Sequence, residues 1–232
     1  MAVFTFHVNG DPENKLRFEP KMLINGGYTG RNQEEVQKHI DELKKIGVPA
    51  PEKTPVFFPK FPERLTRAEE IPCLDEKGHI GEAEYVLLVS GSDIYVSTGS
   101  DHTDRTLETV SIPKAKQMYP NTISTDAWRL EEVESYWDEI SLRSWVELEG
   151  QKKLYQETTL GALLGPRDLL HYVQEIIEVA DLDGLVLYSG TVAGKLEIDY
   201  SPYFEVELAD PRRGLAMKSV YRFRPVTEWF KG

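Results

Sequence analysis

The fold is decided by one stretch of sequence, residues 82–98, which reads EAEYVLLVSGSDIYVST. Two apolar runs, residues 83–89 and 94–98, flank the small and polar residues 90–93, which are typical of a tight turn. The pattern predicts an antiparallel β-hairpin. Residues 85–89 are apolar without alternation, so we expect the first strand to be buried on both faces.

The remaining pattern is also mostly β. We expect a strand and turn before Phe18 and an extended loop or edge strand in the proline-rich residues 49–62. Further strands are expected at residues 142–148, 185–188, 195–198, 203–208 and 216–224. Helices are expected at 32–46, after a cap at Asp126, and at 166–180. Few helices and many antiparallel strands favour an α+β or mainly-β fold.

Composition excludes several functions. The 232 residues hold 27 Lys plus Arg against 39 Asp plus Glu, a formal charge of −12, so we expect neither nucleic acid nor anionic membrane as a partner. The single cysteine, Cys73, excludes a disulfide framework and a cysteine-based zinc site. The N-terminal residues do not resemble a signal peptide, and no apolar run reaches the roughly 20 residues of a membrane span. We therefore expect a cytoplasmic protein.

Three acidic residues could form a metal site. Glu82 and Glu84 are two apart on the expected strand, so their side chains share a face and repel unless a cation lies between them. Asp101 follows the next β stretch and could complete an all-oxygen site for Mg²⁺, Mn²⁺ or Ca²⁺. The alternatives are a solvated strand face and a polar turn stabilised by Asp104 and Arg105. The metal hypothesis requires the three carboxylates to converge without being neutralised by salt bridges.

Other candidates are less specific. His39 and Glu42, at i and i+3 on a helix, suit a general base and its orienting carboxylate, although such surface pairs are common. Lys116 could stabilise an enolate near a metal, or be an ordinary surface lysine. Residues 190–194 could bind an anion through backbone amides and the Thr191 hydroxyl, or be a simple hairpin turn.

Taken in order, these motifs resemble those of the fumarylacetoacetate hydrolase superfamily, and an uncharacterised branch of it in particular. The resemblance covers roughly residues 23–223 and lies in the order of the motifs, because no single one is specific. The matching segments are Gly27-Tyr28, His39-Ile40-Asp41-Glu42, Pro55-Val56-Phe57-Phe58, Glu82-Ala83-Glu84, Asp101-His102-Thr103-Asp104-Arg105, Lys116, residues 156–159 and Gly190-Thr191-Val192-Ala193-Gly194. One departure is the insertion of residues 29–38 between Tyr28 and His39.

The resemblance implies a mixed β-roll with a few flanking helices in residues 23–232, preceded by a strand or hairpin extension in residues 1–22. It also implies a homodimer and a Mg²⁺ or Mn²⁺ cofactor. By position, the metal ligands would be Glu82, Glu84 and Asp101, the catalytic residues His39, Glu42 and Lys116, and the substrate-binding residues Tyr28, Arg31, Arg105 and Thr191.

The implied activity is metal-dependent cleavage of a carbon–carbon bond in a small 2-oxo acid or 1,3-dicarbonyl, by hydrolysis or decarboxylation, through a metal-stabilised enolate. Hydration or isomerisation of an enol or oxo acid on the same site is an alternative, because the pocket lining decides among these reactions. A non-catalytic binding relative is a third reading.

Overall fold

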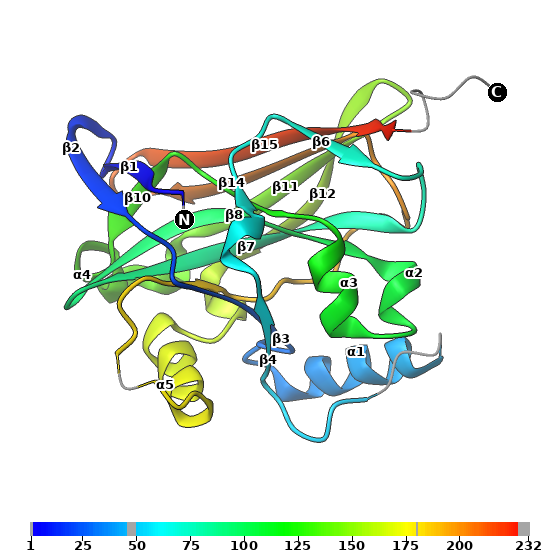
Figure 1. The fold of residues 1–232 in the computed structure, drawn as a ribbon, viewed down its shortest axis with the longest axis horizontal. Coiled ribbons are helices and arrows are strands. Elements are labelled where there is room, and N and C mark those ends of the chain that lie inside the picture. The colour runs from blue at the N-terminus through cyan, green and yellow to red at the C-terminus, as the bar shows by residue number, and fades with distance from the viewer. Residues whose placement is uncertain (1, 46–49, 180, 227–232) are drawn as a thin grey trace.

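The computed structural model describes residues 2–45, 50–179 and 181–226, except for the side chains of His39, Glu42 and Leu43. Two β-sheets pack face to face, and a few short helices flank them (Figure 1). The α+β, mainly-β class expected from the sequence is confirmed.

The larger sheet has ten strands in the order β2-β1-β10-β8-β7-β13-β3-β4, with β9 and β5 continuing from β8 off this path. Its strands are β1 (Phe4–Val8), β2 (Asp11–Phe18), β3 (Met22–Gly27), β4 (Val56–Lys60), β5 (Leu65–Thr66), β7 (His79–Ser90), β8 (Asp93–Asp104), β9 (Asn121–Ile123), β10 (Asp126–Arg129) and β13 (Leu185–Tyr188). The proline-rich segment was expected to be an extended loop or an edge strand. It supplies β4, which is an edge strand of this sheet.

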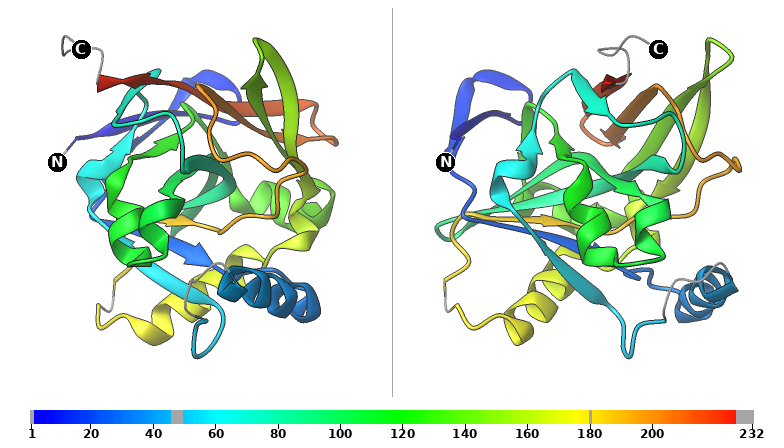
Figure 2. Two further views of the ribbon diagram at one scale, coloured as in Figure 1. Left: turned by 90° about the vertical axis from the view of Figure 1, so that its right-hand side faces the viewer. Right: turned by 45° about the vertical axis from the view of Figure 1, so that its right-hand side comes forward.

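The smaller sheet has five strands in the order β12-β11-β14-β15-β6. They are β6 (Glu70–Cys73), β11 (Ser141–Leu148), β12 (Gln151–Thr159), β14 (Tyr203–Asp210) and β15 (Leu215–Pro225). The helices are α1 (Gln33–Lys45), α2 (Arg105–Glu108), α3 (Ile112–Met118), α4 (Leu130–Val133) and α5 (Pro166–Ile176), with 3-10 turns at Pro62–Arg64, Glu134–Glu139 and Leu160–Ala162. In Figure 1 and in both views of Figure 2, α1 and α5 lie at the end of the molecule away from the small sheet, and the buried residues Leu169, Leu170 and Val173 of α5 join the core that the two sheets share.

The hairpin predicted at residues 82–98 forms the centre of the molecule. Its strands β7 and β8 are longer than expected and pair from His79 and Asp104 to Ser90 and Asp93. Tyr85 and Leu87 face the main core between the sheets, whereas Val86 and Leu88 belong to a second core on the opposite face. The expectation of a strand buried on both faces is therefore confirmed.

Three expectations about secondary structure are corrected. Asp126 does not cap a helix, because residues 126–129 form β10, which pairs with both β8 and β1 and outweighs the local helical pattern. Residues 195–198 form a loop and not a strand. The helix expected at 166–180 ends at Ile176, and residue 180 lies outside the described part.

The N-terminal segment forms the expected hairpin of β1 and β2, which joins the large sheet because β1 pairs in parallel with β10. Asn32 caps α1, since its side-chain oxygen accepts from the amides of Glu34 (3.1 Å) and Glu35 (3.3 Å). Among the described helices, none is both long and apolar enough to cross a membrane.

Candidate metal centre

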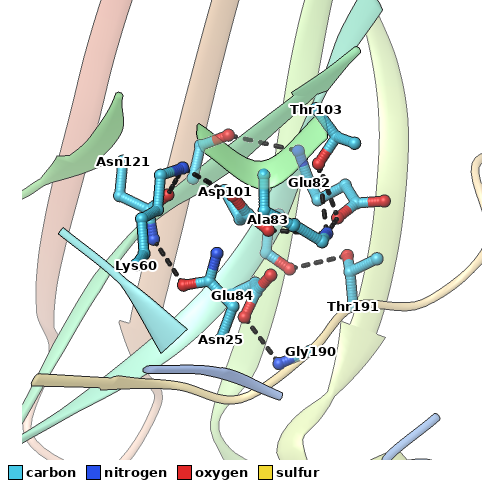
Figure 3. Close-up of polar contacts among 12 residues, drawn as sticks. Asn25, Lys60, Glu82, Ala83, Glu84, Asp101, Thr103, Asn121, Gly190 and Thr191 are labelled. Atoms are coloured by element: carbon cyan, nitrogen blue, oxygen red, sulfur yellow. Dashed lines mark hydrogen bonds and ion pairs between the residues drawn. The ribbon is translucent and has the colours of Figure 1, made fainter. Parts of the chain in front are cut away.

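The β7–β8 hairpin brings together Glu82, Glu84 and Asp101, which we call the carboxylate triad. Glu82 lies directly opposite Asp101 in the antiparallel pairing, and Glu84 is two residues further along the same face. One oxygen of each carboxylate lies within 4.8 Å of the others (Figure 3). Asp101 was expected after the end of a strand; it lies instead within β8, and this pairing is what brings it to Glu82.

Two lysines contact the triad. The Nζ atom of Lys116, in α3, is 2.6 Å from Oδ2 of Asp101 and 3.0 Å from Oε2 of Glu82. The Nζ atom of Lys60, in β4, is 3.2 Å from Oδ1 of Asp101, and both side chains are 0% exposed. With all three carboxylates ionised, the two ammonium groups would leave one negative charge of the triad in excess.

That excess is concentrated at Glu84. Its Oε2 atom accepts a hydrogen bond from the amide of Gly190 (2.5 Å), and its buried Oε1 atom has no hydrogen-bond partner among the described residues. Burial, and then the charges of Asp101 and Glu82, raise the pKa of Glu84 well above its ordinary value. In the protein as it stands, this carboxyl group therefore tends to hold a proton that a bound cation would displace.

The other charged groups shift according to their partners. Burial opposes ionisation of Asp101, but Lys116 and Lys60 outweigh it and hold the pKa of Asp101 below its ordinary value. Burial likewise opposes the charge on Lys116, but Asp101 and Glu82 raise the pKa of Lys116 well above its ordinary value. For Lys60 burial dominates and lowers the pKa, with Asp101 offsetting part of the effect.

A buried amide network holds Lys60 in place. Its Nζ atom also donates to Oδ1 of Asn121 (2.5 Å), and the side-chain amide of Asn121 donates to Oδ1 of Asn25 (2.8 Å). Asn121 lies in β9, which can approach β8 because Gly99 has no side chain. A Cβ atom there would lie 1.9 Å from the carbonyl oxygen of Thr122.

The Gly190-Thr191 turn binds the other side of the triad. Of the backbone amides expected to bind an anion there, that of Gly190 donates to Glu84, a carboxylate of the chain itself. The hydroxyl of Thr191 donates to the carbonyl of Ala83 (2.8 Å) and accepts from the amide of Gln156 (2.8 Å). Gln156 also accepts from the amide of Ala83 (3.1 Å), so this turn is tied closely to β7.

His102, next to Asp101, points to the opposite side of β8. Its ring nitrogens lie 2.8 Å from Nδ1 of His79 and 2.9 Å from the hydroxyl of Tyr221. Burial lowers the pKa of His102 well below its ordinary value, so the imidazole is neutral. His102 therefore hydrogen-bonds to His79 and Tyr221 on the side of β8 away from the triad.

The remaining expected residues lie at different distances from the triad. The phenol of Tyr28 is influenced by the charges of Glu108, Lys116 and Glu82. The charge of Arg105 acts on the nearby Glu108, where it opposes the rise in pKa that burial causes. Arg31, in contrast, donates to both oxygens of Asp138, each at 2.8 Å, and to the carbonyl of Leu163 (2.6 Å).

His39 and Glu42 are in α1, but their side chains lie outside the described residues, so their predicted role stays a prediction. Sequence reasoning missed Lys60, Asn121 and Glu108. Burial and the charge of Glu82 raise the pKa of Glu108 to about 7. Lys60 had one sequence signal, because it alternates with Phe58 along the strand that the aromatic pair predicts.

The triad fits a hard divalent cation. Its donors are all oxygen atoms, as Mg²⁺ and Mn²⁺ prefer. Glu84 offers a buried oxygen without a partner, and the Lys116 ammonium between Glu82 and Asp101 shows that a positive charge is stable at this position.

The fold and this centre define a β-built protein with a buried carboxylate site suited to a divalent metal. The chain belongs to the family described as "Protein of unknown function (DUF2848)", whose sequence profile matches residues 26–221. No curated protein matches it in sequence.

Several solved structures share the fold. One is the apo form of 2-keto-3-deoxy-D-arabinonate dehydratase, which is 14% identical with a TM-score of 0.65, over 91% of this chain and 77% of that one. A second is this dehydratase complexed with magnesium and 2,5-dioxopentanoate, which is 16% identical with a TM-score of 0.61, over 95% and 79%. A third is 4-oxalocrotonate decarboxylase from Pseudomonas putida G7, complexed with calcium and acetate, which is 15% identical with a TM-score of 0.55, over 87% and 76%. At these identities the likeness shows the fold alone.

Proposed function

We propose that this protein is a Mg²⁺- or Mn²⁺-dependent enzyme that cleaves a carbon–carbon bond in a small 2-oxo acid or 1,3-dicarbonyl compound, by hydrolysis or decarboxylation. The observation that carries the proposal is the buried carboxylate triad with its one uncompensated negative charge. The resemblance to the fumarylacetoacetate hydrolase superfamily supports it. So do the neighbours solved with magnesium and 2,5-dioxopentanoate or with calcium.

In this proposal Glu82, Glu84 and Asp101 hold the metal. When bound, such an ion would supply Lewis-acid chemistry, which lowers the cost of forming an enolate. The ammonium group of Lys116 lies beside Asp101 and would stabilise the negative charge that develops on the substrate. Gly190 and Thr191 fix the position of Glu84 and of the strand that carries it.

The proton-transfer pair of this proposal is on α1. His39 and Glu42 are three residues apart in α1, a spacing at which residues of a helix are neighbours. Glu42 would orient the imidazole of His39, which would take a proton from water or move protons at the substrate carbon. Tyr28, Arg31, Arg105 and Thr191 would complete the substrate site. We expect His39→Ala to bind substrate without turning it over, and full activity in that variant would contradict the assignment.

Hydration or dehydration on the same site is the second candidate reaction. It is favoured by the dehydratase among the structural neighbours. A homodimer and a cytoplasmic location stay predictions from the resemblance and from the sequence.

A metal-supplemented screen of 2-oxo acids tests the proposal. Enol absorbance and release of CO₂ report turnover, and calorimetric titration with Mn²⁺ reports binding. We expect Glu82→Gln to lose both activity and Mn²⁺ binding while keeping the fold. The matched control is Glu157→Gln, because Glu157 is an exposed strand residue that pairs with Lys195. Wild-type protein that binds no Mn²⁺ at millimolar concentration would favour a non-catalytic relative.

A further inference from the structure

A pocket with a volume of about 340 Å³ is lined by residues of β4, of α3 and of the segments that follow β3 and precede β4. Tyr28, Val56, Phe58 and Ile112 line it, and their side chains make it predominantly apolar. Its size falls within the roughly 300–1,000 Å³ of small-molecule sites, and apolar cavities of about 150 Å³ already admit benzene. The pocket is therefore large enough for an aromatic ring or a branched alkyl group.

One wall of this pocket leads directly to the triad along β4. Val56, Phe58 and Lys60 are alternate residues of the strand, so their side chains share a face. Lys60 contacts Asp101 at 3.2 Å. Because a strand rises about 3.3 Å per residue, Phe58 lies roughly 7 Å along the strand from the lysine that holds the triad.

A second wall reaches the triad along α3. Ile112 and Lys116 are at i and i+4 of this helix, which places them on one face, about 6 Å apart. Lys116 contacts Asp101 and Glu82. Two separate elements thus present an apolar residue to the pocket and, one step further, a lysine to the triad.

Tyr28 lies at the junction. Burial, and then the charge of Glu108, raise the pKa of this phenol, and the charges of Lys116 and Glu82 also act on it. The neighbouring Gly27 lets Val56 and Phe58 pack closely against the backbone, because a Cβ atom there would lie 3.0 Å from Val56 and 3.3 Å from Phe58. The lining of the pocket therefore adjoins the metal centre through three parts of the chain, β4, α3 and Tyr28.

We propose that this pocket receives an uncharged apolar substituent of the substrate, and that the enzyme selects monocarboxylic 2-oxo acids with an aromatic or branched alkyl tail. The inference rests on the proposed function, since the reactive end of the substrate would lie at the triad. The charged lining residues, Glu52 and Lys53, carry opposite charges and give no net attraction for a second carboxylate. Glu108, near the junction, adds negative charge and disfavours one.

Calorimetric titration of the Mn²⁺-loaded protein tests this with pyruvate, 2-oxopentanoate, 2-oxohexanoate and 2-oxo-4-phenylbutanoate. We expect affinity to rise about fourfold for each buried methylene. Phe58→Ala should lower the ratio of 2-oxo-4-phenylbutanoate affinity to pyruvate affinity about tenfold. Phe57→Ala is the matched control, because Phe57 is the next residue of β4 and does not line this pocket; it lines a second one, which Val56 and Phe58 also border.

The outcomes separate the two proposals. If pyruvate binds but affinity does not rise along the series, or if both phenylalanine variants change the ratio equally, the tail pocket is refuted and the proposed function stands. If no acid binds in the presence of Mn²⁺, the proposed function fails and this inference fails with it. Should Phe58→Ala not fold, Val56→Phe fills the pocket from the same strand face, and an unchanged ratio in that variant overturns the inference equally.

Discussion

Two carboxylates of the triad should respond to neutralisation in opposite directions. We expect Glu84→Gln to stabilise the metal-free protein and Asp101→Asn to destabilise it. Within the described part of the chain Glu84 forms no salt bridge and is repelled by the other two carboxylates, whereas Asp101 forms salt bridges with both buried lysines. Both variants should lose Mn²⁺ affinity. Only Glu84→Gln should do so while the metal-free protein becomes more stable.

The magnitude follows from the distances. Two unit charges 4.8 Å apart repel by about 3–4 kcal/mol at an effective dielectric constant of about 20. Lys116 offsets part of this repulsion because it also attracts Glu84. We therefore expect Glu84→Gln to raise the free energy of unfolding by about 1–3 kcal/mol. Asp101→Asn leaves buried cations without their carboxylate, which costs about 3–5 kcal/mol.

The effect should depend on pH with a definite sign. The pKa of Glu84 is higher in the folded protein than in the unfolded chain, so the folded state keeps a proton that the unfolded chain has lost. The free energy of unfolding of the wild type therefore falls as pH rises above about 4.5, and Glu84→Gln should remove that part of the decline. For Asp101 the pKa is lowered, so its stabilisation is present above the unfolded value and lost as pH falls below it.

Urea denaturation in EDTA at pH 5 and pH 8, with Mn²⁺ titration of each variant, measures these quantities. Glu157→Gln is the control for an exposed pair and should leave the free energy of unfolding nearly unchanged. Equal destabilisation by Glu84→Gln and Asp101→Asn would refute the charge assignment. Unchanged Mn²⁺ affinity in Glu84→Gln would refute the ligand role.

Three further substitutions test the surroundings of the triad. Lys60→Met should lower the free energy of unfolding by about 3–5 kcal/mol, and the loss should be smaller than additive with Asp101→Asn in a double-mutant cycle. Glu108→Gln should stabilise the metal-free protein at pH 8 more than at pH 5, by at most about 3 kcal/mol, because its pKa is raised to about 7; equal effects in denaturation curves at both pH values would contradict this. Gly99→Ala should cost at least about 3 kcal/mol by thermal denaturation, because its Cβ atom would overlap the Thr122 carbonyl, and a stable variant would show that β9 can move away from β8.

Local signals were enough to predict the central hairpin. The apolar runs and the turn at residues 90–93 specify β7 and β8, and the spacing of Glu82 and Glu84 gives their shared face. Local signals failed at Asp126, where an acidic residue before an apolar periodic run is typical of a helix start. Pairing of β10 with two neighbouring strands outweighs that preference, because hydrogen bonds and burial in a sheet exceed the small energy of a cap.

Lys60 shows why the site was only partly predictable. In sequence it is a lysine between prolines and aromatic residues, and lysines are almost never fully buried unless they are paired. Its partner, Asp101, is 41 residues away, and the contact exists only because β3 holds β4 at the edge of the large sheet. Glu108 is similar, since its raised pKa arises from burial and from Glu82, which is distant in sequence.

The balance of charge explains what kind of ligand this centre suits. Buried ion clusters seldom increase stability over a packed apolar core, so the cost of this one indicates a functional site. Once a cation has displaced the proton of Glu84, the triad and its two lysines carry one net negative charge, and a divalent ion would leave one net positive charge at the site. A substrate with a single carboxylate would neutralise it, whereas a dicarboxylate would introduce a second buried charge near Glu108. The same arithmetic of charge that favours a divalent cation therefore favours a monocarboxylic substrate, with its apolar part in the pocket between β4 and α3.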